Sequence, residues 1–268
     1  MRLYVILVFC SNPIFYYMNT VRPKKHLGQH FLKDENIARK IVNSLGPEVQ
    51  NVLEVGPGMG VLTKNLILRE FRDLRVAEID EESVIYLNNH FPGLQIISGD
   101  FLKLDLNELF TGKFAIIGNF PYNISSQIFF KVLEHRDLVD EVVGMVQKEV
   151  AERIAAPPGS KTYGILSVLL QAWYKIDYLF TVNEQVFIPP PKVKSAVIRF
   201  KRNTTDQLEC DERLFFNLVK TGFNQRRKTL RNAIRSLYPE GFNHPFLDKR
   251  AEQLSVSDFI ELAQSIKQ

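Results

Sequence analysis

The stretch Leu53–Thr63, LEVGPGMGVLT, decides how the chain is expected to fold. Its first residues continue an apolar run from Asn51 that is typical of a buried strand, and the residues after the last glycine have helical spacing. Gly56, Gly58 and Gly60 stand between the two, where a strand-to-helix turn lets a ligand approach the backbone closely. The stretch therefore predicts the first strand, turn and helix of a nucleotide-binding type of sheet.

Strand-like and helix-like runs alternate on both sides of this stretch. A helical pattern begins at Asp34, a residue type that caps helices. Strands are predicted at 51–56, 74–80, 94–100, 114–120 and 141–147, and helices at 34–45, 61–69, 83–91 and 125–135. This alternation is typical of an open, mostly parallel α/β sheet with helices on both faces.

The pattern changes after residue 203. Residues 203–212, NTTDQLECDE, are polar and typical of a linker, and only helical patterns follow. We therefore expect a catalytic α/β domain over residues 21–203 and a small α-helical domain over residues 204–268.

Residues 1–20 are predicted to be an N-terminal extension. Their apolar run, residues 3–10, is too short for a transmembrane helix and is followed by no clean cleavage site. Met18 opens an ordinary polar start. A misassigned start codon is the favoured interpretation and a targeting segment is the alternative. No other stretch is expected to span a membrane.

Composition sets broad limits on the function. The 268 residues are 45% hydrophobic and 24% charged, as in ordinary globular proteins, and the net charge of +4 permits an anionic partner without arguing for one. The two cysteines, Cys10 and Cys210, have no neighbours at metal-ligand spacing. We expect no metal site, no disulfide framework and a reducing compartment.

Acidic residues mark three of the predicted strand-to-helix turns. Glu54 precedes the glycines and suits an amino group on a ligand, or a network that holds the loop, better than it suits a pyrophosphate. Glu78 ends the next strand and can accept both hydroxyls of a ribose, while Asp80 beside it can equally be a solvated strand end. Asp100 can accept from an adenine amino group, and Phe101 can cover the ring. Together these residues predict an adenosine-like ligand with an amino-acid tail.

The fourth strand ends in NFPYNIS, residues 119–125. An exocyclic base amine is a poor nucleophile, and two acceptors, the Asn119 side-chain oxygen and the Pro121 carbonyl, would direct its lone pair at a sulfonium methyl. Tyr122 offers a face to a base that has left its stack. Phe120 is interpreted as packing. This loop predicts amino-methyl transfer, and a plain turn is the alternative.

Two further loops are expected to meet at this site. Phe187, in VFIPPPKVKSAV, can stack on the base opposite Tyr122, or it can be a core residue. In KKHLGQHFLKD, Gln29, His30 and Leu32 are placed to close over the bound ligand, although His30 can also be a packing or capping residue.

A basic segment lies near the C-terminus. Residues 220–235 carry six basic residues and no acid, and Arg227, Arg231 and Arg235 would share one face of a helix. With Arg226 and Lys228 they predict contact with RNA phosphates and salt-dependent binding; a solvated face is the alternative.

Four signatures occur in order: GQHFL, LEVGPGMG, NFPYNIS, and VFIPPPKVKSAVIRF followed by FNQRRKTLRN. From about Pro23 to the C-terminus the chain resembles the bacterial small-subunit rRNA adenine dimethyltransferases. The resemblance implies a Rossmann-like, S-adenosylmethionine-dependent fold whose cofactor contacts include Gln29, His30, Leu32, Gly56, Glu78, Asp100 and Asn119. It assigns the target base to Asn119, Tyr122 and Phe187.

The same resemblance implies the activity and the partner. The enzyme would transfer two methyl groups to the 6-amino group of each of two adjacent adenosines near the 3′ end of 16S rRNA, with a role in small-subunit maturation. We expect a cytoplasmic protein that is a monomer, since nothing suggests an obligate dimer. A resistance-type methyltransferase of large-subunit rRNA would share the first three signatures, and a non-catalytic ribosome-assembly factor would keep only the scaffold. The PPPKVKS loop and QRRKTLRN segment argue against the first, and the intact NFPY loop argues against the second.

Overall fold

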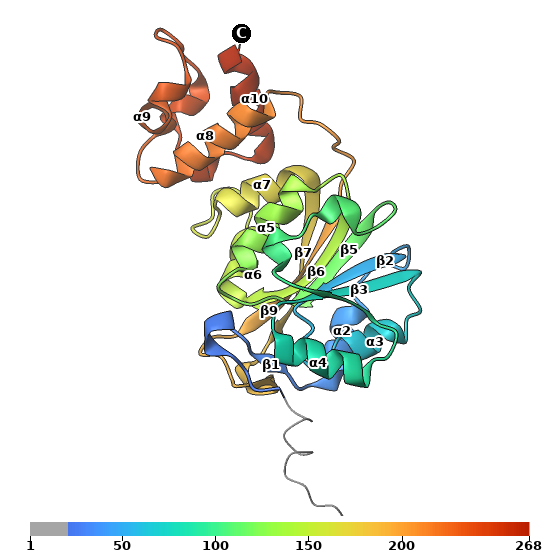
Figure 1. Ribbon diagram of the computed structural model, residues 1–268. Helices are drawn as coiled ribbons and strands as arrows, with labels where there is room; N and C mark the ends of the chain where they lie inside the picture. The colour runs from blue at the N-terminus through green and yellow to red at the C-terminus, as the bar shows by residue number, and fades with distance from the viewer. Residues whose placement is uncertain (1–20, 268) are drawn as a thin grey trace, which may run out of the picture.

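A seven-stranded sheet forms the centre of the molecule (Figure 1). The computed structural model describes residues 21–267, so the predicted extension over residues 1–20 lies outside the described residues. The strand order is β4-β3-β2-β5-β6-β9-β7, and β9 alone runs antiparallel to its neighbours. The strands are β2 (Asn51–Val55), β3 (Asp73–Glu78), β4 (Gln95–Ser98), β5 (Phe114–Asn119), β6 (Val139–Gln147), β7 (Tyr174–Val182) and β9 (Ser195–Arg202). The predicted mostly parallel sheet is confirmed.

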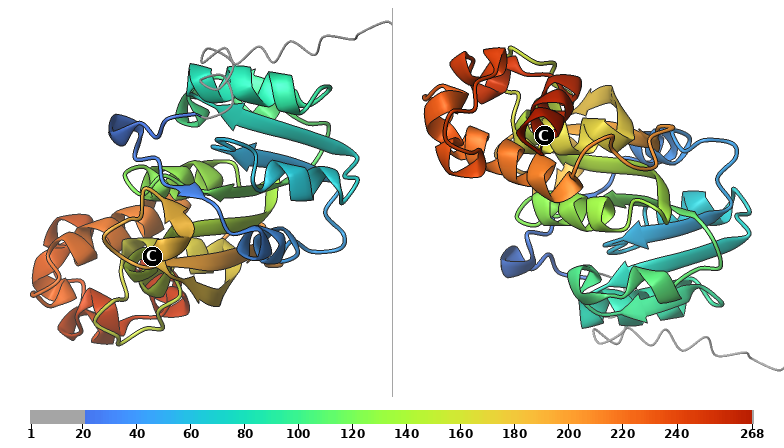
Figure 2. Two further views of the ribbon diagram at one scale, coloured as in Figure 1. Left: turned by 90° about the horizontal axis from the view of Figure 1, so that it is seen from below. Right: turned by 90° about the horizontal axis from the view of Figure 1, so that it is seen from above.

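Helices cover both faces of the sheet (Figures 1 and 2). The apolar cluster on one face includes α2 (Glu35–Val42) and α3 (Thr63–Ile67), and the cluster on the other includes α5 (Ser125–Glu134) and α7 (Ile165–Trp173). Two more helices, α4 (Glu81–His90) and α6 (Lys148–Ile154), follow β3 and β6. As predicted, Asp34 caps α2 by accepting from the backbone N–H groups of Asn36 and Ile37 at 2.9 and 3.0 Å.

Phe120 packs over two neighbouring strands, as predicted. Its side chain is 1% exposed, and its ring lies where β-carbons on Gly118 of β5 and Gly144 of β6 would stand. The two glycines are paired in register across the strands. Burial of such a ring contributes roughly 1.5–3 kcal/mol. Asn119 and Tyr122 therefore flank a residue that anchors their loop in the core.

The C-terminal helices pack on α7. They are α8 (Glu212–Asn224), the short α9 (Leu230–Ala233) and α10 (Val256–Lys267), seen at the top of Figure 1. The Trp173 ring of α7 meets Phe215 edge-on at 6.1 Å and Phe216 face-on at 5.7 Å. One apolar cluster runs from the sheet into this helical unit. The predicted division at residues 203/204 follows the end of β9 at Arg202 and stays a prediction.

The predicted continuous helix over the basic segment is wrong. Helix α8 ends at Asn224, and Gln225 leaves helical geometry with φ −114° and ψ 40°. The Leu230 N–H donates to the Lys249 carbonyl at 2.8 Å, whereas an unbroken helix would direct it to residue 226. Because the segment turns here, Arg227, Arg231 and Arg235 do not share one helical face.

A small two-stranded sheet joins the N-terminal segment to the proline loop. Strand β1 (Phe31–Leu32) pairs antiparallel with β8 (Phe187–Ile188). Among residues 21–267, no helix is both long enough and apolar enough to cross a membrane.

Candidate active site

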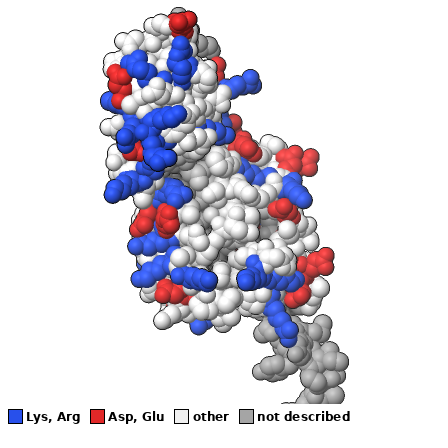
Figure 3. Space-filling model, turned by 90° about the vertical axis from the view of Figure 1, so that its left-hand side faces the viewer, with Lys and Arg blue, Asp and Glu red and all other residues white. Residues whose placement is uncertain are grey.

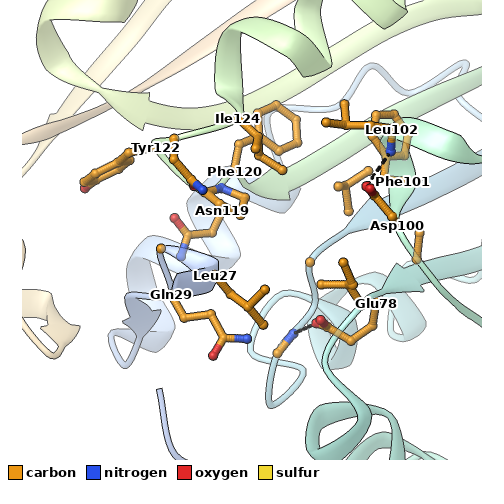
Figure 4. Close-up of a pocket in the computed structure, with 18 of the residues that line it drawn as sticks. Leu27, Gln29, Glu78, Asp100, Phe101, Leu102, Asn119, Phe120, Tyr122 and Ile124 are labelled. Atoms are coloured by element: carbon orange, nitrogen blue, oxygen red, sulfur yellow. Dashed lines mark hydrogen bonds between the residues drawn. The ribbon is translucent and has the colours of Figure 1, made fainter. Parts of the chain in front are cut away.

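A pocket opens where β2, β3, β4 and β5 end (Figure 4). Because the carboxyl ends of parallel strands meet at one edge, residues far apart in sequence converge here. Among the residues predicted from the sequence, those lining the pocket are Gln29, His30, Gly56, Gly58, Glu78, Asp100, Phe101, Asn119, Pro121 and Tyr122. The structure therefore brings together most of the predicted cofactor and base contacts.

The glycine loop has the geometry that its sequence predicts. Gly56, Gly58 and Gly60 adopt φ values of 69°, 57° and 77°, which favour glycine over other residues. A β-carbon on Gly58 would lie 2.7 Å from the Phe31 ring. A side chain at position 58 would therefore displace Phe31, which also lines the pocket.

Glu78 ties the glycine loop to the end of β3. Its carboxylate accepts from the backbone N–H groups of Gly58 at 3.0 Å and Asp80 at 2.9 Å, and its side chain lines the pocket. Burial raises the pKa of Glu78, although these hydrogen bonds oppose the rise. Each oxygen keeps a second lone pair, so the carboxylate can still accept from a ribose hydroxyl.

Three predicted cofactor contacts lie outside the main pocket. Glu54 is buried and accepts a hydrogen bond from the Thr63 hydroxyl at 2.6 Å. This contact matches the alternative role predicted for Glu54, a network that holds the loop. Burial raises the pKa of Glu54 to about 8. Leu32 is a core residue, although it and Glu54 line a small adjoining cavity with Asn119. A β-carbon on Gly60 would meet the Phe91 ring. Direct contact between these three residues and the cofactor is not supported; they shape the pocket from behind.

The turn after β4 is held by hydrogen bonds from a lysine that was not predicted from the sequence. Asp100 caps the turn by accepting from the Leu102 N–H at 2.9 Å. The buried Lys131 of α5 donates to the carbonyls of Leu102 at 3.0 Å and Leu104 at 2.6 Å. A lysine on a helix gives no sequence signal for a contact with the carbonyls of a distant turn. Asp100 and Phe101 are thus held at the pocket wall.

Residues 24–31 form a strap that closes one side of the pocket. The Lys24 ammonium donates to Asp80, and the Gln29 amide approaches the same carboxylate at 3.4 Å. Asp80 also accepts from Ser83 and caps α4, and despite its burial these partners hold the pKa of Asp80 below its ordinary value. Asp80 is therefore not the solvated strand end that the sequence allowed but the anchor of the strap.

The NFPY loop places an amide and an aromatic ring at the pocket. The Asn119 Nδ2 donates to the His30 carbonyl at 2.7 Å, so its oxygen is the atom left to accept from a ligand. The Pro121 carbonyl accepts from the Ile124 N–H at 3.2 Å and keeps a second lone pair. The Tyr122 hydroxyl lies 2.6 Å from the Ser195 Oγ, which fixes the ring at its far end.

Phe187 lies in the core rather than in the pocket. Its side chain is 1% exposed, belongs to the same apolar cluster as Leu32, and stands opposite that residue in the β1–β8 pair. The structure therefore places it as the core residue that the sequence allowed as the alternative. Stacking on a base would require the β1–β8 pair to move, and this role stays a prediction.

The five predicted RNA contacts have three different surroundings. Arg226 pairs with Glu252 at 2.5 Å and donates to the Ser160 carbonyl, and Arg231 pairs with Asp248 at 2.8 Å. Arg227 and Lys228 are exposed, and no ion pair of theirs is found among residues 21–267. Arg235 packs over Tyr238 with its guanidinium 5.1 Å from the ring. Figure 3 shows Lys and Arg side chains clustered over these helices at the top of that face.

No cluster of three or more His, Cys, Asp or Glu side chains within residues 21–267 is arranged to hold a metal ion. What the pocket does offer is a bare glycine loop, carboxylates at two neighbouring strand ends and an apolar wall that includes Phe101 and Ile79. This donor set fits a ribose and an adenine ring better than a charged pyrophosphate, because the buried Glu78 carboxylate would repel phosphate.

Comparison with known proteins gives a family and close relatives. A family model described as Ribosomal RNA adenine dimethylase matches residues 20–268. Two relatives are called Ribosomal RNA small subunit methyltransferase A. The one from Parabacteroides distasonis is 60% identical over 251 residues, which cover 91% of this chain and 94% of the relative. The one from Cytophaga hutchinsonii is 58% identical over 255 residues, which cover 93% and 99%.

Solved structures show the same fold. A dimethyladenosine transferase from Plasmodium falciparum superimposes with a TM-score of 0.70 at 28% identity, covering 87% of this chain and 96% of that one. A 23S rRNA methyltransferase, ErmE, gives 0.65 at 26% identity, covering 89% and 100%. The fold is therefore that of Rossmann-like methyltransferases, as predicted. Since ErmE is named for large-subunit RNA, the shared fold does not by itself choose the substrate.

Proposed function

The chain belongs to the ribosomal RNA adenine dimethylase family, and from this premise we propose that it uses S-adenosylmethionine to dimethylate two adjacent adenosines near the 3′ end of 16S rRNA. The enzyme class predicted from the sequence, an rRNA adenine dimethyltransferase, is confirmed by the family match and the relatives. The choice of adenosines, the cytoplasmic location, the monomeric state and the role in small-subunit maturation belong to the proposal.

The observation that carries the proposal is the fixed orientation of Asn119. Because its amide nitrogen is engaged by the His30 carbonyl, the oxygen is the group left to accept a hydrogen bond from a base amine. The Pro121 carbonyl, two residues on, is the second acceptor. Two acceptors on the amine hydrogens turn the nitrogen lone pair toward its target and favour a pyramidal nitrogen, which is a positional and electrostatic effect.

The cofactor is proposed to lie over the glycine loop. Bound there, S-adenosylmethionine supplies a methyl group on a sulfonium. Glu78 accepts from the ribose hydroxyls, Asp100 accepts from the adenine amine, and the strap around Gln29 excludes water from the bound ligand. The Tyr122 ring, half-buried and held by Ser195, offers a face to the target base.

Sequence identity favours small-subunit RNA over large-subunit RNA. The relatives named for the small subunit are 58–60% identical over nearly the whole chain, whereas the large-subunit enzyme is 26% identical. A purely scaffolding role is disfavoured because the Asn119–Tyr122 loop is intact and faces the pocket.

The test offers labelled S-adenosylmethionine to unmethylated small and large ribosomal subunits in separate reactions. We expect label in the small-subunit RNA only. Label in the large-subunit RNA would support the resistance-type alternative, and no label in either, with cofactor binding intact, would support the scaffolding alternative.

A further inference from the structure

His30 makes three contacts that the sequence prediction does not explain. Its carbonyl accepts from Asn119, its ring stacks on Tyr122 at 5.5 Å between centroids with a 29° interplanar angle, and its Nδ1 lies 2.7 Å from the Pro189 carbonyl. A carbonyl only accepts, so Nδ1 carries the proton and donates. One residue therefore joins the strap, the NFPY loop and the proline loop.

The contacts on Tyr122 come from two sides. Ser195 holds the hydroxyl at 2.6 Å, and the His30 ring covers one face of the phenol. An aromatic ring has two faces, so a base that stacks on Tyr122 while His30 stays in place uses the opposite face. The imidazole is in turn fixed by its hydrogen bond to Pro189, so it cannot swing freely away.

We propose that His30 is a positioning residue for the target base: its ring packs against one face of Tyr122 and its Nδ1–H donates to the proline loop, so that the opposite face of Tyr122 is presented to the base. This inference rests on the proposed function, since it concerns how the base is held for methylation. It gives His30, which lines the pocket, a role toward the base through Tyr122.

Three substitutions separate the two ring contacts. His30→Ala removes both, His30→Phe keeps a ring on Tyr122 but no donor, and His30→Asn keeps a donor near the Nδ1 position but no ring. All three keep the backbone carbonyl that orients Asn119. The matched control is His90→Ala, because His90 also stacks on a tyrosine, Tyr86, and contacts its carbonyl at 2.8 Å, but lies on α4 outside the pocket.

The measurement is steady-state methylation of unmethylated small subunits, with the cofactor Kd measured separately by calorimetry. We expect His30→Ala to lower kcat/KM for the subunit by about tenfold, the combined effect of a stacking contact and a hydrogen bond. His30→Phe and His30→Asn should each recover part of the loss. Cofactor Kd should stay within about twofold of wild type, and His90→Ala should match wild type in both.

Three results would overturn the inference. One is wild-type kcat/KM in all three His30 variants. Another is a rise in kcat/KM in His30→Ala, which would mean that the ring blocks the base. A third is a loss of cofactor affinity that parallels the loss of activity. Failure of the wild-type enzyme to methylate small subunits would instead count against the proposed function.

Discussion

The strand-end pocket and the C-terminal basic segment hold their functional groups in opposite ways. In the pocket, Asn119 and Glu78 are fixed by backbone hydrogen bonds at the ends of buried strands. In the basic segment, Arg226 and Arg231 are engaged in ion pairs, while Arg227 and Lys228 extend into solvent. We infer that function depends on the exact position of side chains in the pocket, and on the number of exposed positive charges in the basic segment. Substitutions should accordingly have large, position-specific effects in the pocket and small, salt-dependent effects in the segment.

The largest expected effect is at Asn119. Asn119→Ala removes the acceptor for the base amine, and we expect methyl transfer to small subunits to fall by about 10³-fold or more while cofactor affinity weakens only a few-fold. Single-turnover transfer and calorimetry measure the two separately. Asn88→Ala, an exposed amide on α4, is the control and should behave as wild type. Near-wild-type methyl transfer by Asn119→Ala would contradict the role of Asn119 as the acceptor for the base amine.

The next effect is at the glycine loop. Gly58→Ala places a β-carbon against the Phe31 ring at a φ of 57°, so we expect the loop to shift and cofactor affinity to fall by about 10²-fold. Gly93→Ala is the matched control: its φ of 88° is also in the range that L side chains rarely adopt, but nothing lies within 4 Å of the added carbon. If both variants lose affinity equally, backbone strain and not the contact with Phe31 would be the cause.

A third effect concerns the pH dependence of stability. Burial raises the pKa of Glu54 from 4.5 to about 8. The folded state therefore holds this proton where the unfolded state has lost it, and the stabilisation present below pH 4.5 is lost as the pH rises through about 8. We expect the free energy of unfolding of the wild type to fall between pH 5 and 8 by about 3 to 4 kcal/mol more than that of Glu54→Gln. Denaturant unfolding at a series of pH values measures this; parallel curves would contradict the prediction.

The smallest effect is expected in the basic segment. Arg227→Glu with Lys228→Glu should weaken binding to small subunits by about fivefold to tenfold and reduce the slope of log affinity against log salt by about 1 to 2. Arg39→Glu with Arg72→Glu, exposed charges elsewhere on the chain, should leave that slope unchanged. A loss of RNA affinity that does not depend on salt would argue against phosphate contact.

Arg226→Ala should instead lower thermal stability, because it breaks the contacts to Glu252 and Ser160.

The two regions also differ in how far the sequence could predict them. Strand ends were predictable because an apolar run stops where polar residues begin, which located Glu78, Asp100 and Asn119 directly. The hydrogen-bond and ion-pair partners of a side chain could not be predicted, because Asp80 meets Lys24 and Arg226 meets Glu252 only through tertiary packing. The helical spacing of the basic segment failed for the same reason: the Leu230 N–H is taken by Lys249, which local periodicity cannot report.

The measurement that tests the central claim most directly is nucleoside analysis of small-subunit RNA after reaction with S-adenosylmethionine labelled in its methyl group. The pocket is proposed to direct an exocyclic adenine amine at the methyl donor. The predicted result is label in N6,N6-dimethyladenosine, confined to two adjacent positions near the 3′ end of the RNA. Label in a cytidine or guanosine, or on a ring nitrogen of adenine, would contradict it.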